Sequence, residues 1–167
     1  MHRFFSGHDD HGNVVFNFSQ NVASDLSAFA AGYHEAGKLL IKNLEYSRGY
    51  SDYNGYPILF LYRHALELYL KAIVFRGAEL IKLGSNKNID TENLFTKHRL
   101  TWILPKLESI FKTMGWEWSF ELSGLKSFGD FVDLIRGIEA IDPESYHFRF
   151  PVNKNGKELL PHLQLLM

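Results

Sequence analysis

The sequence predicts an all-α fold, an antiparallel bundle of four to five helices that ends in a short extended or hairpin segment. Apolar residues recur at steps of three, four and seven over four long stretches, which is the period of a helix with one buried face. Turn-forming residues separate these stretches. The chain has 167 residues, of which 46% are hydrophobic, enough to bury one core. We therefore expect a single domain over 1–167.

Composition excludes several classes of protein. The net charge of -1 argues against a general binder of nucleic acid or anionic membranes, although it leaves a local basic groove open. The chain has no cysteine, which excludes disulfides, cysteine nucleophiles and cysteine-based zinc sites. No signal peptide is recognisable, and charged residues interrupt the most apolar segment, 58–75. We expect no membrane span and a cytoplasmic protein.

The first two predicted helices cover 18–47 and 57–83. Glycines and alanines thin one face of the first helix, which lets a neighbouring helix come close. Residues 48–56 are rich in turn formers and predict a loop, after which Pro57 suits the first position of the second helix. Gly77 marks an expected weak point inside that helix.

The later elements are shorter. Helices are predicted over 97–114 and 122–141, the first with Pro105 inside it, so a kink or a late start is expected there. Apolar and polar residues alternate over 146–150, as in an extended segment, and 153–156 predicts a turn before a short return strand.

Residues 1–17 predict a flexible lead-in. It holds several histidines and aspartates, including His2, His8 and His11. A metal site at this end, serving a hydrolase, is one hypothesis, but a disordered terminus is the favoured interpretation. We therefore assign neither a metal nor a cofactor to the chain.

The second helix carries the most informative pattern. Arg63, His64, Glu67 and Lys71 share one arc of the helix, while the rest of its circumference is apolar. Two interpretations stay open. The arc is either a solvated ladder of i,i+4 ion pairs, or it faces a cleft in which arginine and lysine bind phosphate and histidine supplies acid–base chemistry.

Two further residues are candidates for the same site. His98, with Lys97 and Arg99 beside it, opens the predicted third helix, where free backbone donors and cations attract anions. Arg149 lies between two phenylalanines that would hold it in place. For each, a structural role is the alternative: an exposed basic turn for His98, and a salt bridge that fixes the tail for Arg149.

Three segments resemble the HEPN-like superfamily (higher eukaryotes and prokaryotes nucleotide-binding). They are Tyr-Arg-His-Ala-Leu-Glu-Leu-Tyr-Leu-Lys-Ala over 62–72, Lys97-His98-x-Leu100, and Asp142-x-x-Ser145-x-x-Phe148-Arg149-Phe150-Pro151. The resemblance covers roughly 57–151. It implies a small helical bundle, often dimeric, with relatives among RNA-cutting toxins and phage-defence components. The Arg-x4–6-His motif of active ribonucleases of this family is absent from the bundle.

The resemblance gives two function hypotheses. In the first, the chain binds RNA or a nucleotide, and acts as a metal-independent ribonuclease of a toxin–antitoxin or phage-defence system, with a homodimeric state and a cognate antitoxin as partners. His64 and His98 are then the catalytic acid–base groups, and substrate is bound by Arg63, Glu67, Lys71 and Arg149. In the second, the chain is a non-catalytic interaction or dimerisation module, and the same residues form a structural network.

Overall fold

The computed structural model describes residues 21–44, 52–118, 124–152 and 155–158. Four helices follow one another there: α1 (Val22–Leu44), α2 (Asp52–Gly84), α3 (Leu100–Met114) and α4 (Phe128–Ile141). In these described parts, β-structure consists of isolated bridge residues, among which Val152 and Glu158 pair antiparallel. The predicted all-α class is confirmed. None of the described helices is long and apolar enough to cross a membrane.

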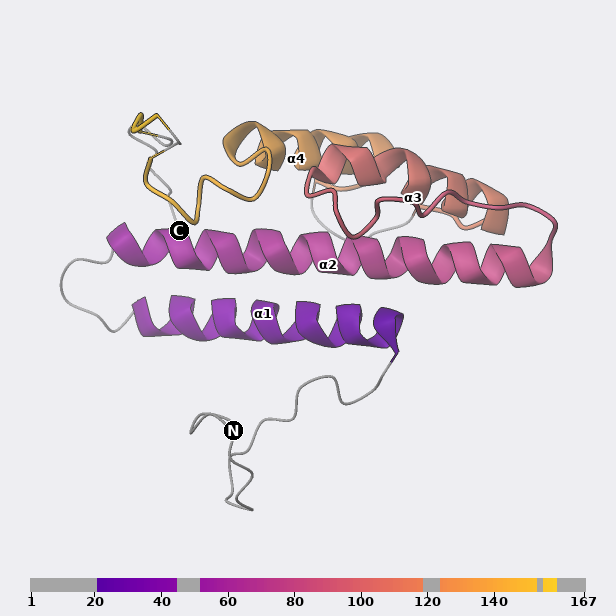
Figure 1. Cartoon of the computed structure of the whole chain (residues 1–167), viewed down its shortest axis with the longest axis horizontal. Coiled ribbons are helices and arrows are strands. Elements are labelled where there is room, and N and C mark those ends of the chain that lie inside the picture. Colours follow the sequence, from indigo (N-terminus) through magenta and orange to yellow (C-terminus); the bar gives the residue numbers. More distant parts are fainter. Residues whose placement is uncertain (1–20, 45–51, 119–123, 153–154, 159–167) are drawn as a thin grey trace, which may run out of the picture.

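The central element is α2, the longest helix. Figure 1 shows α1 along one side of it, with α3 and α4 on the opposite side. The ring of Tyr33 packs against His64, and Arg76 donates a hydrogen bond to the hydroxyl of Ser24. Because later residues of α2 meet earlier residues of α1, these two helices run antiparallel.

The direction of α3 differs from the antiparallel order that we predicted. Arg63 binds the carbonyl of His98, just before α3, and Ile110 packs against Gly77. Both helices therefore run the same way. Figure 1 shows the reason: the connection 85–99 runs back along α2 before α3 begins. α4 then returns antiparallel to α3, with Glu139 beside the amide of Thr101.

The main hydrophobic core lies between α2, α3, α4 and the 85–99 connection. Its fully buried members are Leu70, Val74, Ile81, Leu94, Leu100, Ile103, Leu104, Leu107, Ile110 and Ile135. On the other side, the close approach predicted for α1 is present, because a Cβ on Gly37 would lie 2.7 Å from Tyr62 Cε2. α2 has no break at Gly77, contrary to the prediction. A Cβ there would lie 2.6 Å from Ile110 Cγ2, so glycine serves packing between α2 and α3.

The two long helices have different ends from those predicted. α1 begins after Asn21, whose Oδ1 accepts a hydrogen bond from the amide of Ser24 at 3.1 Å and so caps the helix. α2 begins at Asp52, so residues 52–56 are helical where a loop was expected. Pro57 lies inside the helix instead of at its first position. It removes only one backbone donor near the helix end, a loss that the packed remainder of α2 tolerates.

α3 starts three residues later than predicted, at Leu100, and Arg99 is its N-cap residue. His98 therefore precedes the helix and does not open it. Pro105 lies inside the helix, which begins before it, so the late start that was one expectation for Pro105 does not occur. Gly115 ends α3 in the left-handed conformation, with φ 66°.

α4 starts at Phe128, because Ser127 and Asp130 form a capping box: each side chain accepts a hydrogen bond from the other residue's backbone. The prediction of an extended segment over 146–150 is wrong. The amides of Arg149 and Phe150 both bond the carbonyl of Tyr146, so the chain turns tightly there. The predicted return strand lies outside the described residues, as does the lead-in.

Candidate functional site

The charged arc of α2 is buried. Arg63, Glu67 and Lys71 are 3%, 1% and 3% exposed, and they face the start of α3 and the segment after α4. This excludes the solvated ladder as an interpretation of the arc. A buried charge is tolerated only when opposite charges and hydrogen bonds compensate it, so the partners of these three groups decide what the arc can do.

Glu67 is at the centre of the buried charges. Its Oε2 accepts a hydrogen bond from Arg63 Nη1 at 2.7 Å, and its Oε1 accepts one from Lys71 Nζ at 2.7 Å. His98 Nδ1 lies 3.0 Å from Oε1. Burial raises the pKa of Glu67, but the hydrogen bonds from Lys71, Arg63 and His98 and the charge of Lys71 outweigh burial, so the net pKa is below the ordinary 4.5. Glu67 is therefore ionised at neutral pH.

Arg63 connects α2 to two distant segments. Besides Glu67, it donates from Nη2 to the carbonyl of His98 at 2.6 Å and from Nε to the carbonyl of Asp142 at 3.3 Å. The same Nε lies 3.3 Å from Asp142 Oδ2. All three guanidinium nitrogens are thus engaged inside the protein, and the substrate-binding role predicted for Arg63 has no free donor nitrogen to serve it.

Asp142 was not singled out from the sequence as a site residue. It is fully buried, and its Oδ1 accepts hydrogen bonds from the amides of Tyr146 at 2.6 Å and His147 at 2.9 Å. The available signal was Asp142-Pro143, which predicts a helix end and an aspartate that bonds nearby amides. No pattern in the sequence indicated that Arg63 would contact Asp142.

His98 combines a buried partner with an accessible ring. Its side chain is 52% exposed, whereas the Glu67 side chain is 1% exposed. Because an ionised carboxylate only accepts hydrogen bonds, Nδ1 of His98 must carry the proton in this contact. Nε2 is then the basic nitrogen, which is the arrangement in which a carboxylate orients a histidine for acid–base chemistry.

His64, the second predicted catalytic residue, has different surroundings. Its ring stacks on Phe60 at a centroid distance of 5.4 Å and meets the edge of Tyr33 at 4.6 Å. Burial lowers the pKa of His64, although the charge of Glu67 acts in the opposite direction. His64 therefore lies among aromatic rings that reach α1, while His98 is the histidine bonded to Glu67.

Arg149, the last predicted residue, is exposed. Its Nε donates to the carbonyl of Ser145, and its guanidinium lies 5.8 Å from the ring centre of Phe60. The salt bridge considered as the structural role of Arg149 is not made with Glu67, which pairs with Arg63, Lys71 and His98 in the described part of the chain. Three or more metal-binding side chains do not gather anywhere among the described residues.

Comparisons with protein-family models, with curated proteins and with solved structures find no match for this chain. The function therefore has to be argued from the site itself.

Proposed function

We propose that this chain is a HEPN-like RNA-binding domain that cleaves RNA without a metal ion. The observation that supports this proposal is the contact of 3.0 Å between the half-exposed ring of His98 and the buried carboxylate of Glu67. A fixed carboxylate sets the tautomer of a histidine and stabilises its charged form, and an imidazole titrates near neutral pH. The resemblance to toxin and defence proteins suggests the biological setting, with a cognate antitoxin as partner.

The proposed reaction is internal transesterification. Nε2 of His98 takes the proton of a ribose 2′-hydroxyl, and the freed oxygen forms a bond to the adjacent phosphorus. The bond from phosphorus to the 5′-oxygen breaks, and that oxygen takes a proton from water. The products are a 2′,3′-cyclic phosphate and a free 5′-hydroxyl. Glu67 holds His98 in orientation and stabilises the imidazolium that forms.

The proposal assigns new roles to the predicted substrate-binding residues. Arg63 and Lys71 are buried and paired with Glu67, so they keep Glu67 ionised and do not touch RNA. The phosphates are held instead by exposed cations around His98. These are Lys97 and Arg99, which flank His98 in the chain, and Arg149 in the segment after α4. Arg99 also lies 3.8 Å from Glu139.

Mixed RNA incubated with the pure protein tests the proposal. We expect cleavage that a chelator does not alter, and a rate about 10²–10⁴-fold lower for His98→Ala, because the acid–base group is lost. His34→Ala is the matched control. His34 belongs to α1 and packs against Tyr62 of α2, so its replacement should leave the rate of cleavage unchanged. Undiminished cleavage by His98→Ala, or intact RNA with the wild-type protein, would contradict the proposal.

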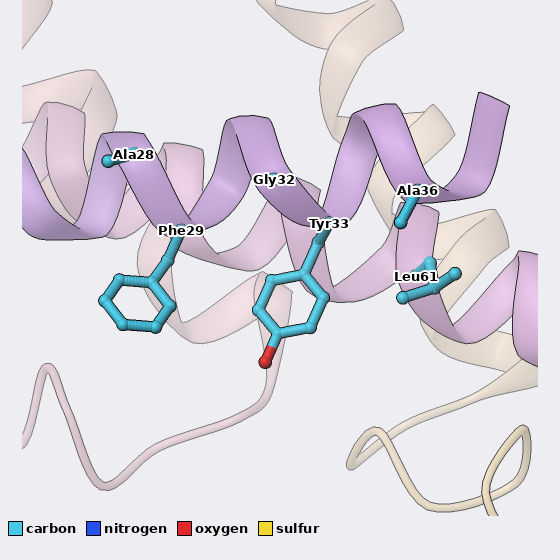
Figure 2. A pocket seen from close by; sticks show the side chains of 6 residues that line it. All are labelled: Ala28, Phe29, Gly32, Tyr33, Ala36 and Leu61. Atoms are coloured by element: carbon cyan, nitrogen blue, oxygen red, sulfur yellow. The ribbon is translucent and has the colours of Figure 1, made fainter. Parts of the chain in front are cut away.

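A second candidate function is assembly with another copy of the chain. An open apolar groove of about 520 Å³ lies along α1 and α2. Figure 2 shows Phe29 and Tyr33 projecting from α1 on the same side. Phe29 is 51% exposed, and a Cβ on Gly32 would meet nothing within 4 Å. The groove is lined by Ala28, Phe29, Gly32, Tyr33, Ala36 and Leu61.

The groove suits a second copy because it is self-complementary. Its small residues leave room for the exposed Phe29 ring of the partner, and an apolar surface of this kind is typical of an interface. Sedimentation equilibrium should give twice the monomer mass of 19.3 kDa. Gly32→Glu has space within one chain and should yield a folded monomer. A monomeric wild-type protein would refute this assignment.

A further inference from the structure

A row of flat side chains crosses the surface between the segment after α4 and α2. The ring of Tyr146 lies 4.6 Å from that of Phe150. Arg149 follows, with its guanidinium 5.9 Å from Phe150 and 5.8 Å from Phe60. Phe60 in turn stacks on His64, with an angle of 9° between the rings. We call these five residues the stacking row.

The backbone is shaped to hold this row. Ser145 has φ 58°, a left-handed conformation that is unfavourable for a residue with a side chain. It turns the chain back so that Arg149 reaches the Ser145 carbonyl and Phe60. Asp142 fixes the same turn through the amide of Tyr146. A strained turn that is held by buried hydrogen bonds favours a functional role for the side chains that it presents.

The row is open to solvent at Phe150 and Arg149. Phe150 is 45% exposed and Arg149 is exposed. Within the described residues, the hydrogen bond of Arg149 runs from Nε to Ser145, which leaves its two terminal nitrogens for a ligand. Aromatic rings and the plane of a guanidinium group stack on unpaired bases, and the positive charge of the guanidinium group binds the phosphates between those bases.

Hydrogen bonds of Arg63 connect the segment after α4, which carries part of the row, to His98. Asp142, which holds the turn at Tyr146, bonds Arg63, and Arg63 bonds the carbonyl of His98. Arg63 thus contacts both the segment that carries part of the row and the backbone of His98.

We propose that the stacking row is the substrate-binding surface for single-stranded RNA, with unpaired bases lying on Phe150 and beside Arg149. This inference rests on the proposed RNA function and narrows its substrate class. The bases of a duplex are stacked on one another, so their faces cannot lie on the rings of the row. Single-stranded RNA is therefore bound and cut, and the duplex of the same sequence is not.

The test measures binding by fluorescence polarisation with an end-labelled, mixed-sequence single strand and with its duplex. His98→Ala serves as the parent protein, because it should bind RNA without cutting it. Adding Phe150→Ala should weaken single-strand binding about 10–100-fold, as expected for one lost stacking contact. Adding Arg149→Lys, which keeps the charge and loses the planar fork, should also weaken it. Trp116→Ala is the control. Trp116 is as exposed as Phe150, at 45%, and lies beyond the end of α3, so its replacement should leave the affinity for RNA unchanged.

The outcomes separate the two proposals. If Phe150→Ala and Arg149→Lys bind the single strand as tightly as the parent, the row is not the substrate surface, while the assignment of His98 stands. Equal affinity for the duplex and the single strand would also contradict the proposal that the stacking row binds single-stranded RNA. If the parent binds neither form of RNA, and the wild-type protein cuts neither, the proposed function itself fails, and the row fails with it.

Discussion

Replacing Glu67 with leucine is expected to lower the free energy of unfolding by about 3–5 kcal/mol. The substitution removes the one carboxylate that pairs with both Arg63 and Lys71 inside the protein. Two cations that are 3% exposed would then lack their main counter-charge, and burial strongly disfavours such ions. Urea or guanidinium unfolding, followed by circular dichroism, measures the loss.

Two matched variants separate the charge effect from loss of packing. Lys71→Met added to Glu67→Leu should recover part of the stability, because the buried ammonium is then gone while Arg63 keeps the Asp142 carboxylate as a counter-charge. Glu35→Leu removes a carboxylate from an exposed pair with Lys38 and should leave stability nearly unchanged. A Glu67→Leu protein as stable as the wild type would show that the buried ions are not held by Glu67.

Replacing Asp142 with alanine is expected to cost about 2–4 kcal/mol. The change leaves the amides of Tyr146 and His147 without their acceptor and removes a carboxylate beside Arg63. The segment after α4 should lose its anchor to α2. Hydrogen exchange by mass spectrometry should then show faster exchange over residues 143–150 than over the α2–α3 core.

Asp142→Asn separates the two roles of this side chain. Its amide oxygen still accepts the two backbone hydrogen bonds, whereas its charge toward Arg63 is gone. We expect residues 143–150 to keep their slow hydrogen exchange, and we expect the free energy of unfolding to fall by only part of the loss caused by alanine. Fast exchange in the asparagine variant, or wild-type exchange in the alanine variant, would mean that Asp142 does not anchor the segment.

Much of the fold follows from local patterns in the sequence. The spacing of apolar residues in each of the four helices can be found within that helix alone. Gly115 could be predicted to end α3 because glycine adopts the left-handed conformation without help from other residues. The start of α4 was missed although its signal is local, because Ser127 and Asp130 form a capping box in which aspartate replaces the usual glutamate. The helical start of α2 was missed because turn-forming residues over 52–56 predict a loop, and packing overrides that preference.

The arrangement of the site depended on tertiary structure, which local patterns do not carry. The arc of Arg63, Glu67 and Lys71 is visible in the sequence, yet burial or exposure of that arc is decided by what covers α2. The connection 85–99 runs back along α2 and brings His98 to Glu67, a course that periodicity cannot predict. Alternation over 146–150 predicts a strand, but Asp142 draws the amide of Tyr146 into a turn, and that partner is set by the fold.

The central claim is that Glu67 stays ionised inside the protein, held by Arg63 and Lys71, and orients His98. Its carboxyl pKa, followed by carbon NMR as the pH is lowered, tests this most directly. We expect a midpoint below 4.5, the ordinary value. The stabilisation from Glu67 is then complete above pH 4.5 and is lost as the pH falls through the folded pKa. A midpoint above 4.5 would contradict the account, because burial would then outweigh the cations and the ring of His98 would lack a fixed negative partner.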